Sequence, residues 1–99
     1  MLSDIIRFSW DENKAISNWE KHGVSFQEAE SVFYDECARL IHDPDHSTEE
    51  DRFIMLGMSC KLCLLIVAHC YRDNEGVIRL ISARKATKNE AKQYEEFLK

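Results

Sequence analysis

The fold is decided by one stretch of sequence, Leu62-Cys63-Leu64-Leu65-Ile66-Val67-Ala68-His69-Cys70-Tyr71. Successive side chains of a strand point to opposite faces, and in this stretch both alternating sets are apolar. Such a strand is predicted to lie at the centre of a sheet with both faces covered. Short turns separate it from strand patterns at 52–58 and 77–84, so both neighbours are predicted to be antiparallel to it.

Further helix and strand patterns flank this three-stranded centre. On the N-terminal side they predict a short strand over 5–10, a helix over 12–22, a second helix over 26–34 and a weak strand over 37–41. On the C-terminal side, Thr87 and Glu90 have the spacing of a capping box that begins a last helix. The order predicts an α+β fold in which a small antiparallel sheet carries two N-terminal helices and one C-terminal helix.

The length of 99 residues predicts one domain, residues 1–99. Residues 1–4 lack the basic and apolar character of an export leader, and the longest apolar run is far shorter than the roughly 20 residues that span a bilayer. We therefore expect a cytoplasmic protein without a membrane segment. In that compartment the cysteines are expected to be free thiols; they are Cys37, Cys60, Cys63 and Cys70.

The formal net charge is −5. This balance argues against broad binding of duplex nucleic acid. Acidic residues are concentrated in residues 1–50 and basic residues in residues 51–99, so an anion site is expected mainly in the second half.

Three groups of side chains are candidates for chemistry. Lys21 and His22 end the first helix, where they can exchange protons or simply interact with the helix dipole. Arg52 alternates with apolar residues of its strand, which suits an anion contact or a salt bridge to a nearby glutamate. Arg84 and Lys85 stand where a strand ends and a helix begins, and both can serve one phosphate only if the chain bends there.

Five stretches, in order along nearly the whole chain, carry a resemblance to the BrnT toxin family. They are Phe8-Ser9-Trp10-Asp11-Glu12-Asn13-Lys14-Ala15, Lys21-His22-Gly23-Val24-Ser25-Phe26, Asp43-Pro44-Asp45-His46-Ser47, Arg52-Phe53 and Ile81-Ser82-Ala83-Arg84-Lys85-Ala86-Thr87. The resemblance implies a fold similar to that of the RelE-type ribonucleases and a toxin that cleaves RNA and inhibits translation, on the ribosome or off it. It also implies neutralisation by BrnA, a ribbon-helix-helix antitoxin that supplies the only contact with DNA.

RNA cleavage without a metal requires a base, an acid and cations that stabilise the charge on the phosphate. With the resemblance, the sequence predicts that Arg52 and Arg84 hold the phosphate and that Lys85 adds charge. His22 or Lys21 then exchanges protons, and Tyr94 orients one of these groups. No cofactor and no metal is expected.

Two alternatives remain open from the sequence. The negative net charge fits a non-catalytic module that has retained only the antitoxin-binding surface of the toxin and acts in transcriptional control. The spacing of Cys60 and Cys63 matches half of a zinc site, so a zinc-binding or thiol-redox module is the third interpretation.

Overall fold

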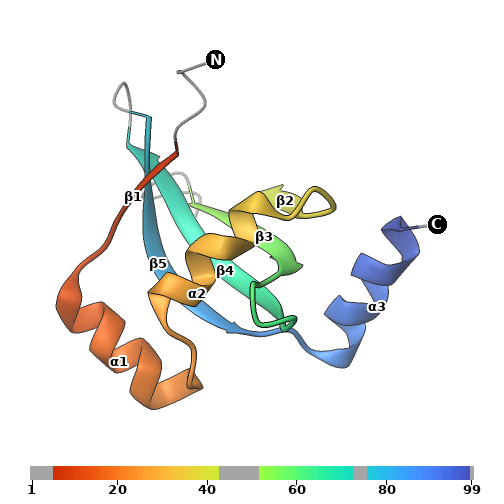
Figure 1. The fold of residues 1–99 in the computed structure, drawn as a ribbon, viewed down its shortest axis with the longest axis horizontal. Coiled ribbons are helices and arrows are strands. Elements are labelled where there is room, and N and C mark those ends of the chain that lie inside the picture. Colours follow the sequence, from red (N-terminus) through yellow and green to blue (C-terminus); the bar gives the residue numbers. More distant parts are fainter. Residues whose placement is uncertain (1–5, 43–51, 73–75, 99) are drawn as a thin grey trace.

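The computed structural model describes residues 6–42, 52–72 and 76–98 (Figure 1). Its elements follow in the order β1 (Arg7–Ser9), α1 (Glu12–His22), α2 (Phe26–Ser31), the 3₁₀ turn η2 (Val32–Tyr34), β2 (Arg39–His42), β3 (Arg52–Met58), β4 (Leu64–Arg72), β5 (Val77–Lys85) and α3 (Lys88–Phe97). This order confirms the predicted elements. The predicted second helix is α2 followed by η2, and the stretch 43–47 lies outside the described residues.

The strands form one sheet in the order β1-β5-β4-β3-β2. The central β4 is antiparallel to β3 and β5, as the alternation and short turns predicted, and β2 is antiparallel to β3. The first strand differs, because β1 pairs with β5 in parallel. The sheet is therefore mixed: no hairpin joins β1 to its neighbour, and a long crossover through the helices permits the parallel direction.

The two faces of the sheet are covered by different helices. On one face, residues of α2 and its flanks pack against alternate residues of the central strands; these residues are Val24, Phe26, Ala29, Val32, Leu65, Val67, Leu80 and Ala83. On the other face, Tyr94 of α3 packs against Leu56 and Ile66. Thus β4 is covered on both faces, as predicted. In Figure 1, α3 lies beside β3, on the side of the molecule away from β1 and α1.

Helix α1 is attached to the edge of β5 by a single buried side chain. The Asn18 amide nitrogen donates to the Ala83 carbonyl at 2.9 Å, and the Ala83 N–H donates to the Asn18 side-chain oxygen at 3.0 Å. The same nitrogen donates to the Val24 carbonyl at 2.9 Å. Asn18 therefore bonds to β5 as a neighbouring strand would, and fixes the last turns of α1 beside this strand.

Candidate functional site

All arginines of the chain lie on strands, and the strands contain neither aspartate nor glutamate. The arginines are Arg7, Arg39, Arg52, Arg72, Arg79 and Arg84. The structure describes the side chains of all of these except Arg72. The guanidinium groups of the chain are thus concentrated in the sheet even though the net charge is −5.

The described arginines of β1, β3 and the first half of β5 point to one face of the sheet. Phe8, Ile78 and Leu80 pack in the core beneath α2, so the alternating Arg7 and Arg79 point the opposite way. On β3, Ile54 packs in the cluster around Tyr94. Arg52 alternates with Ile54 and shares that side.

The remaining two arginines contact α3 on the same face. The Arg39 guanidinium lies over the ring of Phe97, and Arg84 forms an ion pair with Glu90. We call the surface formed by Arg7, Arg39, Arg52, Arg79 and Arg84 the arginine face.

Arg52 and Arg79 flank one residue of the central strand. Cys70 of β4 pairs with Arg52 on one side and with Arg79 on the other. Neighbouring strands are about 4.8 Å apart, so the two arginine backbones are roughly 10 Å apart. Two guanidinium groups that leave the same face at this separation can reach the oxygens of one phosphodiester.

Sequence reasoning missed Arg79. The signal that could have found it is the alternation Ile78-Arg79-Leu80, in which a lone cation separates two core residues. A related argument drew attention to Arg52, which alternation places on the same side of its strand as Ile54 and Leu56.

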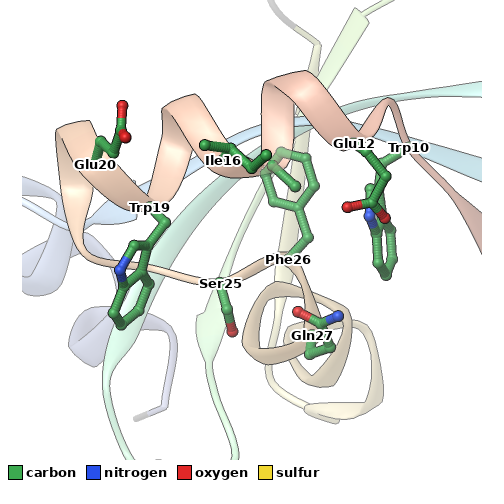
Figure 2. A pocket seen from close by; sticks show the side chains of 9 residues that line it. Trp10, Glu12, Ile16, Trp19, Glu20, Ser25, Phe26 and Gln27 are labelled. Carbon is green, nitrogen blue, oxygen red and sulfur yellow. The ribbon is translucent and has the colours of Figure 1, made fainter.

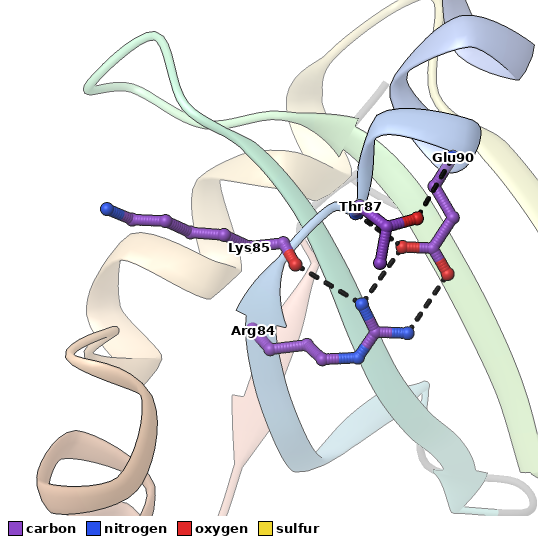
Figure 3. A network of polar contacts seen from close by, with 4 residues as sticks. All are labelled: Arg84, Lys85, Thr87 and Glu90. Carbon is purple, nitrogen blue, oxygen red and sulfur yellow. Dashed lines mark hydrogen bonds and ion pairs between the residues drawn. The ribbon is translucent and has the colours of Figure 1, made fainter.

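The anion site predicted beside Arg84 is occupied by a carboxylate of the chain itself (Figure 3). The Arg84 guanidinium donates to both carboxylate oxygens of Glu90, at 2.9 and 3.0 Å, and the Thr87 N–H donates to the same carboxylate at 2.8 Å. The hydrogen bond from Arg84 is the main cause that lowers the pKa of Glu90 to about 2. Glu90 thus neutralises the cation that was expected to hold the phosphate.

Lys85 does not join Arg84 in one site. Strand β5 continues through Lys85, whose backbone pairs with Leu65, and consecutive strand residues point to opposite faces. Figure 3 shows the two side chains leaving β5 in opposite directions. Arg84 and Lys85 could bind the same anion only if the chain bent between them. The chain does not bend there, so the expectation that both bind one phosphate is corrected.

Tyr94 is buried, and its hydroxyl donates to Asp35 at 2.6 Å. The same Asp35 oxygen accepts from the Met58 N–H at 2.8 Å. Burial and the neighbouring Asp35 carboxylate raise the pKa of Tyr94 above its usual value. The hydroxyl therefore joins α3 to the segment after η2, and its partner is Asp35 rather than a group of the arginine face.

Lys21 and His22 are exposed at the end of α1, beside β5. Together with Lys14 they line a hollow of about 150 Å³ whose other wall contains Ser82. Ser82 alternates with the core residue Ala83 and so lies on the side of the arginine face. The structure therefore brings the predicted proton-exchanging residues to the edge of that face.

The cysteines form no disulfide, and all of them are free. Cys60 and Cys63 stand in the hairpin between β3 and β4, which closes through a 2.8 Å hydrogen bond from the Ser59 N–H to the Cys63 carbonyl. Within 6–42, 52–72 and 76–98, no three His, Cys, Asp or Glu side chains are placed to bind a metal. None of the helices in the described ranges has the length and apolar character needed to cross a membrane.

Comparison with known proteins agrees with this fold. The chain is similar to the crystal structure, at 1.1 Å resolution, of the ribonuclease toxin BrnT from Brucella abortus, with a TM-score of 0.66 and 24% identity over 85% of this chain and 100% of that chain. At this identity the likeness shows the fold. No curated protein matches the chain. Residues 10–90 match the family described as the ribonuclease toxin, BrnT, of type II toxin-antitoxin systems. The match spans most of the chain and confirms the resemblance seen in the sequence: the protein belongs to the BrnT family of ribonuclease toxins.

Proposed function

We propose that this chain is a metal-independent endoribonuclease that binds its RNA substrate on the arginine face. The observation that carries the proposal is the alignment of arginines from β1, β2, β3 and β5 on one side of a sheet whose strands contain no carboxylate. A local concentration of positive charge attracts a polyanion even when the net charge of the protein is negative. The net charge of −5 is therefore compatible with RNA binding.

Arg52 and Arg79 hold the scissile phosphate in this proposal. Guanidinium groups donate two parallel hydrogen bonds to phosphate oxygens and stabilise the charge that builds up on them during cleavage. Arg84 forms an ion pair with Glu90, so we assign it to the rim of the arginine face. The phosphate contacts are assigned to Arg52 and Arg79, which flank Cys70. Lys85 leaves β5 on the opposite side and is not assigned to the phosphate.

Proton exchange is assigned to the end of α1. Cleavage through attack of the RNA 2′-hydroxyl requires a group that removes its proton and a group that protonates the leaving oxygen. His22 and Lys21 lie beside Ser82 at the edge of the arginine face, where an RNA strand laid across β5 would reach them. Histidine carries out such transfers near neutral pH.

The biological setting follows from the family. We propose that cleavage inhibits translation in the cytoplasm, with RNA positioned on the ribosome or bound directly. A ribbon-helix-helix antitoxin of the BrnA type neutralises the toxin, and the complex contacts DNA only through that antitoxin.

Inducible expression in a bacterial host tests this proposal. Expression of the wild-type chain should arrest growth and generate new RNA 5′ ends, and co-expression of the neighbouring antitoxin gene should prevent both. Purified protein should keep its cleavage activity in excess EDTA. Normal growth with intact RNA would favour the non-catalytic module, and loss of cleavage in EDTA that zinc or magnesium restores would contradict the metal-independent mechanism.

A further inference from the structure

Helix α1 presents two sides of different chemistry. Lys14 and Lys21 lie on the side that faces Ser82 and the arginine face. The other side forms one wall of a groove of about 270 Å³ that α1 shares with the start of α2 (Figure 2). The apolar residues that line this groove are Trp10, Ala15, Ile16, Trp19 and Phe26.

The groove has a buried floor and exposed apolar walls. Phe26 is buried and packs edge-on against Trp10, with the ring centroids 5.7 Å apart. Ile16 and Trp19 are 55% and 56% exposed, although both are large and apolar. Figure 2 shows Trp19 and Trp10 at opposite ends of the groove with Phe26 between them. Apolar side chains gathered around a hollow mark a surface that binds another molecule.

The charges around the groove select the kind of partner. Glu12 and Glu20 line it one turn before and one turn after Ile16, and no lysine or arginine is among the lining residues. Carboxylates at these positions repel RNA phosphates and attract cationic side chains. The groove is therefore suited to a protein segment with an apolar anchor between lysines or arginines.

We propose that this groove binds such a segment of the antitoxin, with the anchor between Trp19 and Phe26 and the cations beside Glu12 and Glu20. The inference rests on the proposed function, because it takes the partner from the toxin-antitoxin pairing. The acidic rim formed by Glu12 and Glu20 complements the cationic side chains of such a segment. Because the groove and the arginine face lie on different sides of α1, groove variants should alter antitoxin binding without altering RNA cleavage.

Calorimetric titration of the purified full chain with the purified product of the neighbouring gene tests the proposal. Trp19→Ala should weaken the affinity at least about 30-fold, as truncation of a central aromatic anchor does. Ile16→Ala should weaken it about 10-fold, and the double charge reversal Glu12→Lys with Glu20→Lys by a similar factor that shrinks at high salt. The matched control is Tyr34→Ala, which removes an exposed aromatic ring outside the groove and should change affinity less than about 3-fold.

Wild-type affinity in Trp19→Ala and Ile16→Ala would overturn the proposal. It would also be overturned if both substitutions dissolved a dimer of the chain and left antitoxin affinity unchanged, because the occupant would then be a second copy. Measuring RNA cleavage with the same samples distinguishes failure of the groove proposal from failure of the proposed nuclease function. A wild-type chain that cleaves no RNA but binds the antitoxin through Trp19 would contradict the nuclease and support the groove.

Discussion

The carboxylate of Glu90 accepts hydrogen bonds from Arg84 and Thr87, and the bond from Arg84 is the main cause of its lowered pKa of about 2. Because this pKa is below the usual value of 4.5, ionised Glu90 stabilises the fold at neutral pH. The stabilisation is lost as the pH falls from about 4.5 toward about 2. The Arg84 side chain is 40% exposed, so solvent screening limits the contribution to about 1 kcal/mol.

Glu90→Gln should therefore lower the free energy of unfolding by about 1 kcal/mol at neutral pH. Urea denaturation of both proteins across a pH series measures this difference, which should shrink to nothing as Glu90 of the wild type becomes protonated. A difference that stays constant down to about pH 2 would contradict the assignment.

Tyr94 is predicted to stabilise the fold without taking part in cleavage. Tyr94→Phe removes the hydrogen bond to Asp35, which keeps those from the N–H groups of Met58 and Cys37. We expect a loss of about 1–2 kcal/mol in thermal or urea denaturation, because the deleted bond is to a charged acceptor. The cleavage rate per folded molecule, measured well below the melting temperature, should equal that of the wild type. A tenfold lower cleavage rate in the folded variant would show that Tyr94 takes part in cleavage.

The sequence predicted the types of site residue better than their partners. Alternation identified Arg52 because it places this cation on the same side of its strand as Ile54 and Leu56, and alternation applied to β5 would have found Arg79. Nothing local predicts that Glu90 turns back onto Arg84, since that contact depends on the angle at which α3 leaves the sheet. The opposite directions of Arg84 and Lys85 depend on where β5 ends, which is the least predictable feature of an element.

At the scale of elements, Asn18 carries the attachment of α1 to β5. Asn18→Leu would remove the hydrogen bonds of the Asn18 side chain. The N–H and carbonyl of Ala83 and the carbonyl of Val24 would then be buried without these partners. We expect a loss of roughly 2–3 kcal/mol in the free energy of unfolding, with faster hydrogen exchange at the Ala83 amide. Cleavage should fall as well, because Lys21 and His22 lose their fixed position beside Ser82.

The control for Asn18 is its neighbour Ser17, which is exposed on the same helix. Ser17→Ala should change stability by less than about 0.5 kcal/mol. Equal stability of Asn18→Leu and Ser17→Ala would show that α1 is attached by other contacts.

Most elements could be predicted because their signals are local. The capping box at Thr87 and Glu90 and the doubly apolar β4 both appear in the structure as predicted. The parallel pairing of β1 with β5 could not be predicted. It depends on a connection that runs through two α-helices, the 3₁₀ turn η2 and three strands, and β1 contributes only Arg7–Ser9 to the pattern.

At the scale of the whole molecule, the distribution of charge matters more than its sum. The acidic residues that the structure describes belong to helices and connections, and two of them, Glu12 and Glu20, border the apolar groove. The arginines belong to the sheet, and those whose side chains the structure describes share one face of it. A small acidic protein can in this way present one surface to RNA and a separate surface to a cationic partner.

The most direct test of the account is the rate of RNA cleavage by purified Arg52→Ala, Arg79→Ala and the double variant, compared with Lys61→Ala, which removes an exposed cation in the β3–β4 hairpin. Each arginine variant should cleave about 100-fold more slowly while keeping a cooperative melting transition, and the control should cleave at the wild-type rate. Arg52→Lys and Arg79→Lys should recover only part of the loss, since an ammonium group cannot form the bidentate contact. Cleavage at the wild-type rate by the folded double variant would contradict the assignment of the arginine face as the site.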